Sequence, residues 1–353
     1  MMKRAWPTCR VSEQGQGSGA TDQTSGSRRA GRRKALVHGA FALVGAVVIA
    51  LIVRSVGPGA LLLALKASAR WLPVLIALEL GRAGMEMLAT LSLSERVRRR
   101  VRFGQLTRIH LIAYAVSNVM PAGRATGEAV KAAMLARYVG TPEATSIGTG
   151  NYAAALLGGA LAAVPCAVVS LALTGWSMLT GLLLLFAAAS VVLVVGFQIA
   201  CRRPDIGGAL VRRFMKIEQA PSAYQDAIGR IPLLPGLASA ASFGSRALFA
   251  AQLGVLLYAS SGSTGVGRAI LALGVSMVGG ALGDVVPGQL GASDGAFALA
   301  GPTLGITAAD GVAMAMTMHV LQIVWGVLGW TLPLVWKAAP APRDGADGLP
   351  AEG

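Results

Sequence analysis

The stretches Asn118-Val-Met-Pro121 and Asp284-Val-Val-Pro287 stand at the ends of apolar segments in opposite halves of the chain. Each is followed by a glycine-rich run and then, at the same spacing, by a carboxylate: Glu128 in the first motif and Asp294 in the second. Proline and glycine interrupt helices, and freed backbone groups at membrane depth are tolerated only where they line a cavity or are buried in protein. Two matched interruptions, one in each half, are typical of a transporter's binding site.

The composition indicates an integral membrane protein. Hydrophobic residues make up 54% of the chain and charged residues only 13%, whereas a soluble domain has about 25% charged residues. The net charge of +15 lies mainly between apolar runs, which favours a role in topology and in contact with anionic lipid headgroups rather than nucleic acid. The three cysteines and three histidines have no metal-ligand spacing, so we expect neither a metal site nor a cofactor.

The pattern of apolar runs predicts an all-α, polytopic fold. A spanning helix needs about 20 residues, and most of the runs are long enough. The runs that end at Asn118 and Asp284 are short, which favours discontinuous or re-entrant helices. The eight predicted transmembrane segments are 36–53, 71–93, 106–120, 147–173, 176–200, 237–260, 268–286 and 307–336.

Basic residues predict the orientation of these segments. Arginines crowd the loops 96–108 and 202–230, so both loops and the N-terminus should be cytoplasmic. Eight complete spans cannot place both loops on one side unless the stretch 122–140 crosses back. We therefore expect 122–140 to be a polar helix that returns through protein, with 289–305 as its counterpart in an inverted repeat. The first motif would then open toward the outer face and the second toward the inner face.

The chain divides into three predicted regions. Residues 1–35 are polar and end in a basic cluster, so we expect a disordered cytoplasmic tail. Residues 36–337 form the transmembrane domain, and 338–353 a disordered C-terminal tail. The expected location is the plasma (cytoplasmic) membrane, and the oligomeric state is left open.

The first motif combines helix-breaking residues with charges. Pro121 removes a backbone donor, and two glycines would let backbone approach a ligand closely. The helix that follows would present free N–H groups to a phosphate, which Arg124 and Lys131 would also bind. Glu128 and Lys131 can neutralise each other when no ligand is bound; the alternative is a helix kink with an interfacial ion pair. The candidate substrate-binding residues are Asn118, Pro121, Gly123, Arg124, Gly127, Glu128 and Lys131.

The second motif has two carboxylates and no base. Asp284 and Asp294 flank Pro287, Gly288 and Gly291, and all five are candidate substrate-binding residues. Together the two motifs could offer opposed charges to a zwitterionic or phosphate-plus-amine headgroup. The alternative is a plain cytoplasmic turn, because Pro-Gly is a common turn dipeptide.

Two further polar sets lie within apolar segments. Glu79, Arg82 and Glu86 share one helical face, where Arg82 can pair with either acid; they either line the binding cavity or form a static structural network. His319 and Gln322 are also one helical turn apart. An interhelical hydrogen bond is a more common role for such a pair than a proton relay.

These motifs resemble the lysylphosphatidylglycerol synthase transmembrane region, also called the flippase-like domain family. The resemblance rests on the stretches 118–131 and 287–294 and extends over about 36–336. It departs at Asp294, where the family usually has Glu, and at Thr126, where a glycine is common. The resemblance places Glu128, Lys131, Pro287, Gly291 and Asp294 on the family's characteristic positions.

The resemblance implies a helical protein that moves aminoacylated phospholipids between leaflets or acts beside hopanoid, glycolipid or glycosylation pathways. The synthase members carry a soluble aminoacyl-transferase domain after the membrane part, and we expect that activity to be absent here. The predicted partners are membrane lipids, especially anionic or aminoacylated phospholipids, and lipid-synthesis enzymes.

We therefore predict a non-enzymatic lipid flippase that works by alternating access and, with no nucleotide motif, by downhill or ion-coupled transport. One alternative is a membrane enzyme with Glu128 or Asp294 as general base, which the lack of a predicted histidine partner disfavours. The other alternative is a scaffold for lipid-synthesis enzymes.

Overall fold

The structure is a computed structural model that describes residues 58–120, 123–203, 221–262, 264–283 and 291–336. All of them belong to one of two compact units, residues 42–353; the other unit, Met1–Phe41, lies outside the described residues. The described residues are helical and contain no strand, which confirms the all-α prediction. The helices are α2 Pro58–Ala69, α3 Leu72–Leu93, α4 Glu95–Arg100, α5 Phe103–Val119, α6 Gly123–Val139, α7 Thr141–Thr174, α8 Met178–Arg202, α10 Pro221–Arg230, α11 Gly236–Ser261, α12 Val266–Gly283, α13 Ala292–Leu304 and α14 Ala308–Val335.

Seven of the eight predicted segments coincide with helices, namely α3, α5, α7, α8, α11, α12 and α14. The first predicted segment, 36–53, lies outside the described residues, as do both predicted tails. The two predicted return helices are α6 and α13. The short helices α2, α4 and α10 were not predicted as separate elements; α4 begins where Ser94 accepts a hydrogen bond from the Val97 N–H, which is an N-cap.

Within the described ranges, five helices are long and apolar enough to cross a membrane: α7, α8, α11, α12 and α14. Of the other predicted spans, α3 has 22 residues but carries three ionisable side chains, and α5 has only 17 residues. The charges of α3 are Glu79, Arg82 and Glu86, and α5 is short because it ends at the first motif. The chain is therefore a polytopic membrane protein whose charged helices are packed among apolar ones.

Helices α5 and α6 form an antiparallel hairpin around the first motif. Near its turn, a Cβ at Gly123 would stand 2.2 Å from the Ser117 carbonyl oxygen, and a Cβ at Gly127 would stand 3.0 Å from the Ala113 carbonyl oxygen. At the other end of the hairpin, Leu106 of α5 packs with Tyr138 of α6 in a buried cluster. Glycine is therefore needed for the two backbones to meet.

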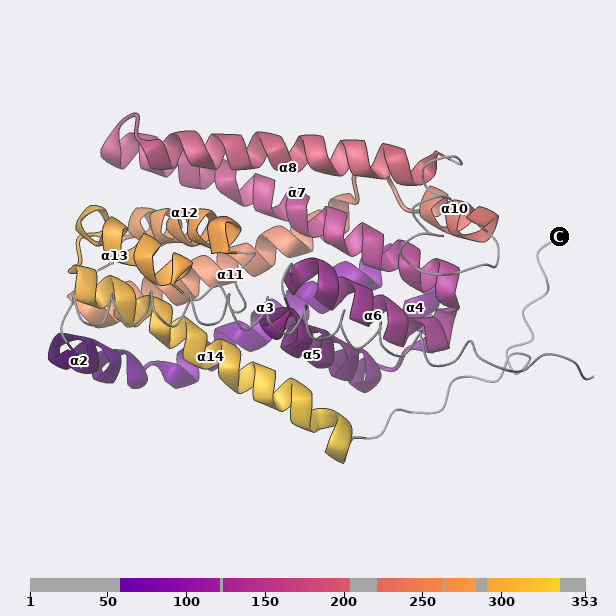
Figure 1. The fold of residues 1–353 in the computed structure, drawn as a ribbon, viewed down its shortest axis with the longest axis horizontal. Coiled ribbons are helices and arrows are strands. Elements are labelled where there is room, and N and C mark those ends of the chain that lie inside the picture. The colour runs from indigo at the N-terminus through magenta and orange to yellow at the C-terminus, as the bar shows by residue number, and fades with distance from the viewer. Residues whose placement is uncertain (1–57, 121–122, 204–220, 263, 284–290, 337–353) are drawn as a thin grey trace, which may run out of the picture. The chain divides into compact units, whose positions relative to one another are not determined.

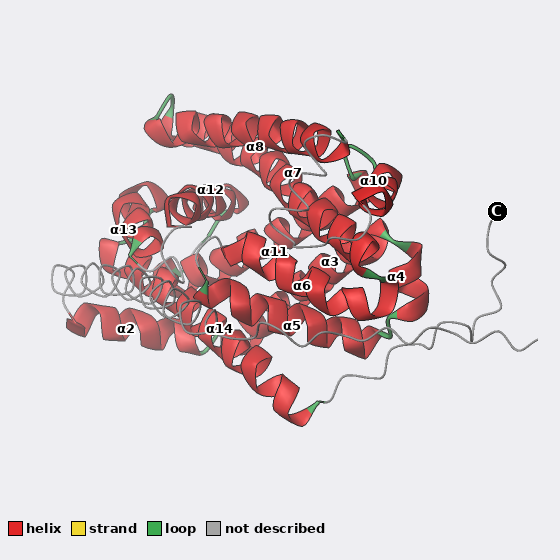
Figure 2. Ribbon diagram, turned by 45° about the vertical axis from the view of Figure 1, so that its right-hand side comes forward, coloured by secondary structure: helices red, strands yellow, loops and turns green. Residues whose placement is uncertain are grey.

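Helices α12 and α13 form a second hairpin around the second motif. A Cβ at Gly279 would stand 2.9 Å from the Cβ of Ala296, which places the end of α12 beside the start of α13. At the other end, Gly305 lies against the Arg268 guanidinium. In Figures 1 and 2 this hairpin and the α5–α6 hairpin lie toward opposite ends of the helix axes, so that α5 and α12 both end toward the middle.

The two hairpins occupy equivalent places in a repeated order of helices. Helix α3 precedes the first hairpin and α7 follows it, while α11 precedes the second and α14 follows it. The halves interlock, because α5 packs on α14, α12 packs on α7, and α3 packs on α11. Figure 1 shows α3 and α11 running in opposite directions along the long axis. This is the arrangement of an inverted repeat.

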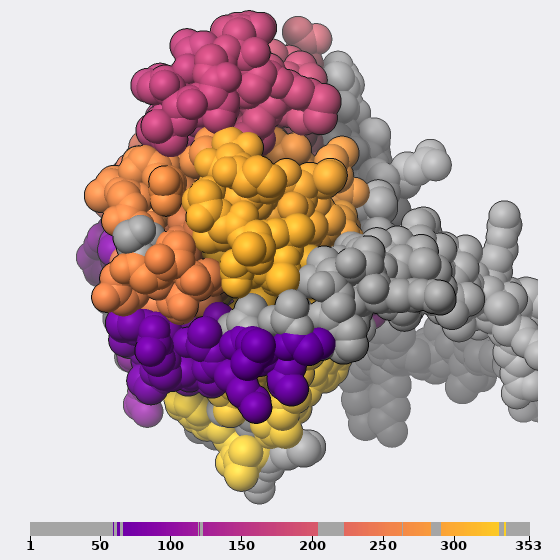
Figure 3. Space-filling model, turned by 90° about the vertical axis from the view of Figure 1, so that its left-hand side faces the viewer, coloured from indigo at the N-terminus to yellow at the C-terminus, as the bar shows by residue number. Residues whose placement is uncertain are grey.

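Helices α4 and α10, which belong to the two basic loops, lie together at one end of the described helices (Figures 1 and 2). Helices α4 and α10 both stand at the end that the α5–α6 hairpin occupies (Figures 1 and 2). Viewed on the opposite end, Figure 3 shows α2, the α12–α13 hairpin and the turn between α7 and α8. Helix α6 returns toward the end at which α4 lies. Both basic loops can therefore lie on the same side of the membrane, which eight complete spans alone would not allow. That this end faces the cytoplasm stays a prediction of the positive-inside rule.

We expect alanine at Gly329 to destabilise the fold, since its methyl group would stand 2.3 Å from the Leu111 carbonyl oxygen and 2.6 Å from the Ala115 Cβ. Overpacking of this kind costs about 1–3 kcal/mol. On the same helix, a Cβ at Gly326 meets no described atom within 4 Å, so Gly326→Ala is the matched control. Unfolding in mixed micelles should show a loss of stability for Gly329→Ala only. Equal losses in both variants would contradict the close approach of α14 to α5.

Candidate functional site

A buried polar cluster joins α3 to α11. The Arg82 Nη1 donates to Glu79 Oε2 at 2.6 Å and to Gln252 Oε1 at 3.3 Å. The Gln252 amide in turn donates to Glu79 Oε2 at 3.0 Å and to the Leu75 carbonyl at 3.0 Å. The guanidinium also lies over the Phe249 ring, 4.4 Å from its centroid, a favourable cation–π geometry. Each charge in this cluster therefore has several partners.

Glu86 connects α3 to the first motif. Its Oε2 accepts from Arg124 Nη2 at 2.7 Å, across from the start of α6. Arg246 of α11 also acts on Glu86 electrostatically. The predicted triad is thus divided: Arg82 pairs with Glu79, whereas Glu86 pairs with Arg124. Both side chains of the Glu86–Arg124 pair are partly exposed, so this pair is the more open one.

Glu128 and Lys131 form the predicted ion pair on α6. Lys131 Nζ lies 2.8 Å from Glu128 Oε1, and the side chains are only 6% and 9% exposed, respectively. The second carboxylate oxygen, Glu128 Oε2, is buried and has no hydrogen-bond partner among the described residues. A buried carboxylate with one oxygen that accepts no hydrogen bond needs an explanation. A donor from a ligand or a water molecule would provide one.

Asp294 is held in a similar way in the second motif. Gly291 has a φ of 84°, in the left-handed region that favours glycine, and its N–H donates to Asp294 Oδ2 at 2.8 Å. His319 Nε2 of α14 lies 3.3 Å from the same oxygen, and its Nδ1 lies 3.4 Å from Gln322 Oε1. The residue is 0% exposed, yet Asp294 Oδ1 has no partner among the described residues.

Polar contacts run from the second motif toward the first. The Asn118 amide donates to the Gln322 carbonyl at 3.4 Å, and Tyr114 forms side-chain hydrogen bonds with Asn118 and Glu79. Asn118 therefore connects Gln322 of α14 with the polar cluster between α3 and α11. The two halves of the chain thus meet at one polar region among the helices.

Several members of this region were not identified from the sequence. Gln252 of α11 and Tyr114 of α5 belong to neither motif, and no local spacing in the sequence points to them. A further chain links Asn151 Nδ2 to Thr90 Oγ1 at 3.0 Å and Thr90 Oγ1 to His110 Nε2 at 3.1 Å. The signal available in the sequence was their occurrence at membrane depth, where polar side chains are rare.

The structure shows where the residues of the first motif stand. Gly123 and Gly127 were predicted to let backbone approach a ligand, but a Cβ at either position would meet the backbone of α5. Arg124 was predicted to clamp a phosphate; it is paired with Glu86 in the structure, and its binding of phosphate stays a prediction. The predicted absence of a histidine partner was wrong, since His319 contacts Asp294. The predicted site residues Pro121, Asp284, Pro287 and Gly288 lie outside the described residues.

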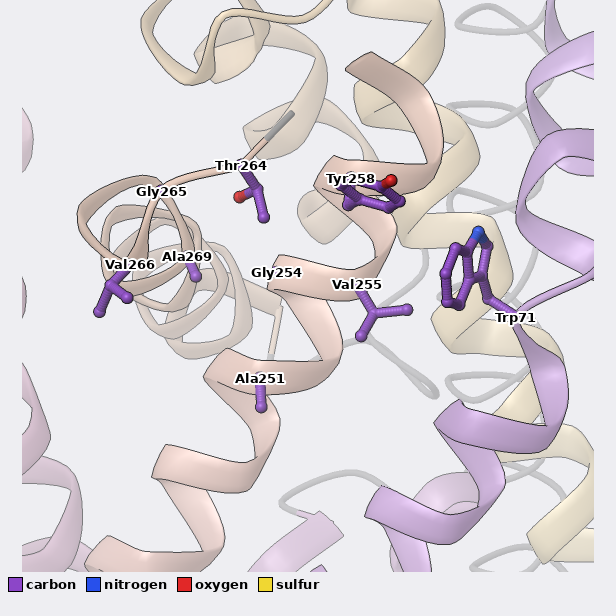
Figure 4. A pocket seen from close by; sticks show the side chains of 9 residues that line it. All are labelled: Trp71, Ala251, Gly254, Val255, Tyr258, Thr264, Gly265, Val266 and Ala269. Atoms are coloured by element: carbon purple, nitrogen blue, oxygen red, sulfur yellow. The ribbon is translucent and has the colours of Figure 1, made fainter. Parts of the chain in front are cut away.

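A pocket of about 350 Å³ lies apart from these charges, between the starts of α3 and α12 and the end of α11 (Figure 4). Its lining is almost entirely apolar and includes Trp71 edge-on to Tyr258, with ring centroids 5.6 Å apart. None of the candidate residues lines it. The described residues also contain no cluster of His, Cys, Asp and Glu that could hold a metal ion.

These features define a class: a polytopic helical membrane protein with two opposed hairpins and a network of buried ionisable groups between them. The model of the family described as lysylphosphatidylglycerol synthase TM region matches residues 37–329. The chain belongs to this family. Comparisons with curated proteins and with solved structures gave no match.

We expect Lys131→Met to destabilise the protein strongly, because it leaves Glu128 as an uncompensated buried charge. Removing one partner of a buried pair costs about 3–5 kcal/mol. The double variant Glu128→Gln/Lys131→Met should regain most of this loss. Unfolding in mixed micelles would measure all three proteins.

Glu95→Gln is the control for that series. Glu95 forms an exposed ion pair with Arg99 on α4, and the hydrogen bond from Arg99 holds the Glu95 pKa below its ordinary value. Exposed pairs contribute little to stability, so this variant should unfold like the wild type. A double variant as unstable as Lys131→Met would show that the α6 pair is not electrostatically coupled.

Proposed function

We propose that the protein binds a phospholipid or lipid-linked headgroup between its two halves and translocates it between the leaflets. The observation that carries the proposal is the matched state of Glu128 and Asp294. Each belongs to one of the two hairpins, each is buried, and each has one oxygen bonded within the protein and one without a described partner. Hydroxyl or amine donors of a headgroup would satisfy both oxygens.

The basic residues of the first motif would hold the phosphate. Arg124 and Lys131 are paired with Glu86 and Glu128 in the structure, so a phosphate would compete with carboxylates that are already bound. Such an exchange keeps every charge compensated both with and without a ligand. Arg124 is partly exposed and would meet the phosphate first, with its planar guanidinium suited to bidentate contact.

Movement of the hairpins would provide alternating access. The α5–α6 hairpin and the α12–α13 hairpin approach the polar region from opposite ends (Figure 1). Displacement of one hairpin would open the region to one side, and displacement of the other would open it to the opposite side. With the basic α4–α10 end in the cytoplasm, this would connect the two leaflets of the cytoplasmic membrane. Anionic or aminoacylated phospholipids suit the mixed charges.

A second candidate is a membrane enzyme that acts on a lipid-linked substrate. The contact between His319 and Asp294 favours it, since such a pair is a common acid–base arrangement. Formation of a new product from a radiolabelled lipid pool would support this candidate, and an unchanged pool would count against it.

In proteoliposomes with fluorescent phospholipids, including a cationic aminoacyl lipid, we expect the wild type to exchange lipid between leaflets. Glu128→Gln and Asp294→Asn should each slow the exchange by at least about tenfold, which corresponds to about 1.4 kcal/mol of lost interaction. The measurement is the fraction of fluorophore that dithionite bleaches over time.

Glu95→Gln is the matched control, since Glu95 is an exposed carboxylate at the α4 end and should exchange lipid at the wild-type rate. Protein yield and unfolding would be compared first, so that loss of folding is not taken for loss of transport. Wild type that exchanges no lipid, or site variants that exchange as fast as wild type, would refute the proposal.

A further inference from the structure

The pairing of Asp294 with His319 differs from every other carboxylate contact in the polar region. Glu79, Glu86 and Glu128 each face a permanently charged or strongly basic side chain. The described ionisable partner of Asp294 is an imidazole, which is a cation only when protonated. A buried carboxylate without a cation is strongly disfavoured. With the contacts described here, the pair is therefore neutral overall only when it carries one proton.

Among the described residues, no other titratable side chain forms a hydrogen bond or ion pair with either partner. Helix α13 packs on α12 and α14, and α14 packs on α2, α5 and α11. Arg268 lies beside Gly305 at the far end of the hairpin, and Asp310 bonds Thr307 there. Tyr114 reaches the pair only through Asn118 and Gln322. The full set on the described parts of these helices is Lys66, Arg108, His110, Tyr114, Arg246, Tyr258, Arg268 and Asp310; Asp284 lies outside the described residues.

The two partners come from elements that would move relative to each other. Asp294 stands in the first turn of α13, inside the second hairpin, whereas His319 stands in the long helix α14. The pair is 3.3 Å apart and its side chains are 1% and 12% exposed. Movement of the hairpin away from α14 would separate the two groups and expose them to water, where the carboxylate is stable without a proton.

We propose that the Asp294–His319 pair is the proton-binding site that couples translocation to a pH gradient. This inference rests on the proposed function, because it names the ion that drives the same site. In the closed state the pair holds one proton, as carboxylate with imidazolium. On opening, this proton leaves His319 for the aqueous phase and leaves a carboxylate and a neutral imidazole. Closure requires uptake of one proton, from the other side in a productive cycle.

The experiment uses proteoliposomes at equal and at opposed internal and external pH, with the membrane potential clamped. For one proton moved per lipid, a gradient of about one pH unit shifts the leaflet ratio of the lipid about tenfold at equilibrium. A protonophore should abolish this shift and leave exchange intact. His319→Gln keeps a hydrogen-bonding side chain but cannot titrate, so it should not accumulate lipid on either side of a gradient. Asp310→Asn, which changes an acid of α14 outside the site, should behave as wild type.

A second readout does not depend on lipid movement. Infrared difference spectra recorded against pH in membranes should show an imidazolium band that titrates in wild type and in Asp310→Asn and is missing in His319→Gln. Asp294→Asn should shift its midpoint, since the carboxylate charge is gone.

The outcomes separate the two hypotheses. Exchange by wild type that ignores the gradient, or a spectrum without a titrating His319 band, would overturn proton coupling and leave lipid translocation standing. If the infrared band titrates but wild type exchanges no lipid, the proton site stands and the proposed function is refuted. If wild type accumulates lipid in response to the gradient, His319→Gln does not, and the infrared band titrates, proton coupling is established.

Discussion

Every ionisable side chain that this fold carries among its apolar helices needs a partner, because an unpaired charge in a membrane interior is costly. The helices are placed so that partners from different elements meet. Glu86 of α3 binds Arg124 of α6, and Asp294 of α13 meets His319 of α14. Glycines at the contacts let the backbones come close enough for this. Charge pairing and helix packing therefore depend on each other.

The two hairpins solve the same physical problem with different chemistry. In the first, Glu128 is neutralised by a lysine one turn away on the same helix, so the pair survives any rigid movement of α6. In the second, Asp294 depends on a histidine of another helix, so its neutralisation changes when the hairpin moves. The first hairpin is thus suited to holding a headgroup, and the second to responding when the two halves move relative to each other.

Much of the fold could be predicted because apolar runs of about 20 residues have few alternatives in a membrane. The i, i+3 spacing of Glu128 and Lys131 also predicted their ion pair correctly. Contacts between distant helices could not be predicted in this way. Nothing near Arg124 indicates that Glu86 would bind it, and nothing near Asp294 indicates His319. The motif glycines were assigned to a ligand because their spacing does not reveal which backbone approaches them.

The arrangement of the helices implies that the two hairpins enter the membrane from opposite sides and bring their charges together between them. Single cysteines in a cysteine-free protein, labelled with an impermeant thiol reagent from each side, test this topology. We expect Arg99→Cys, Thr141→Cys and Ser222→Cys to react from one side, and Thr264→Cys and Thr307→Cys to react from the other. If Arg99→Cys and Thr141→Cys react from opposite sides, α5 and α6 do not form a returning hairpin, and the proposed inverted repeat is wrong.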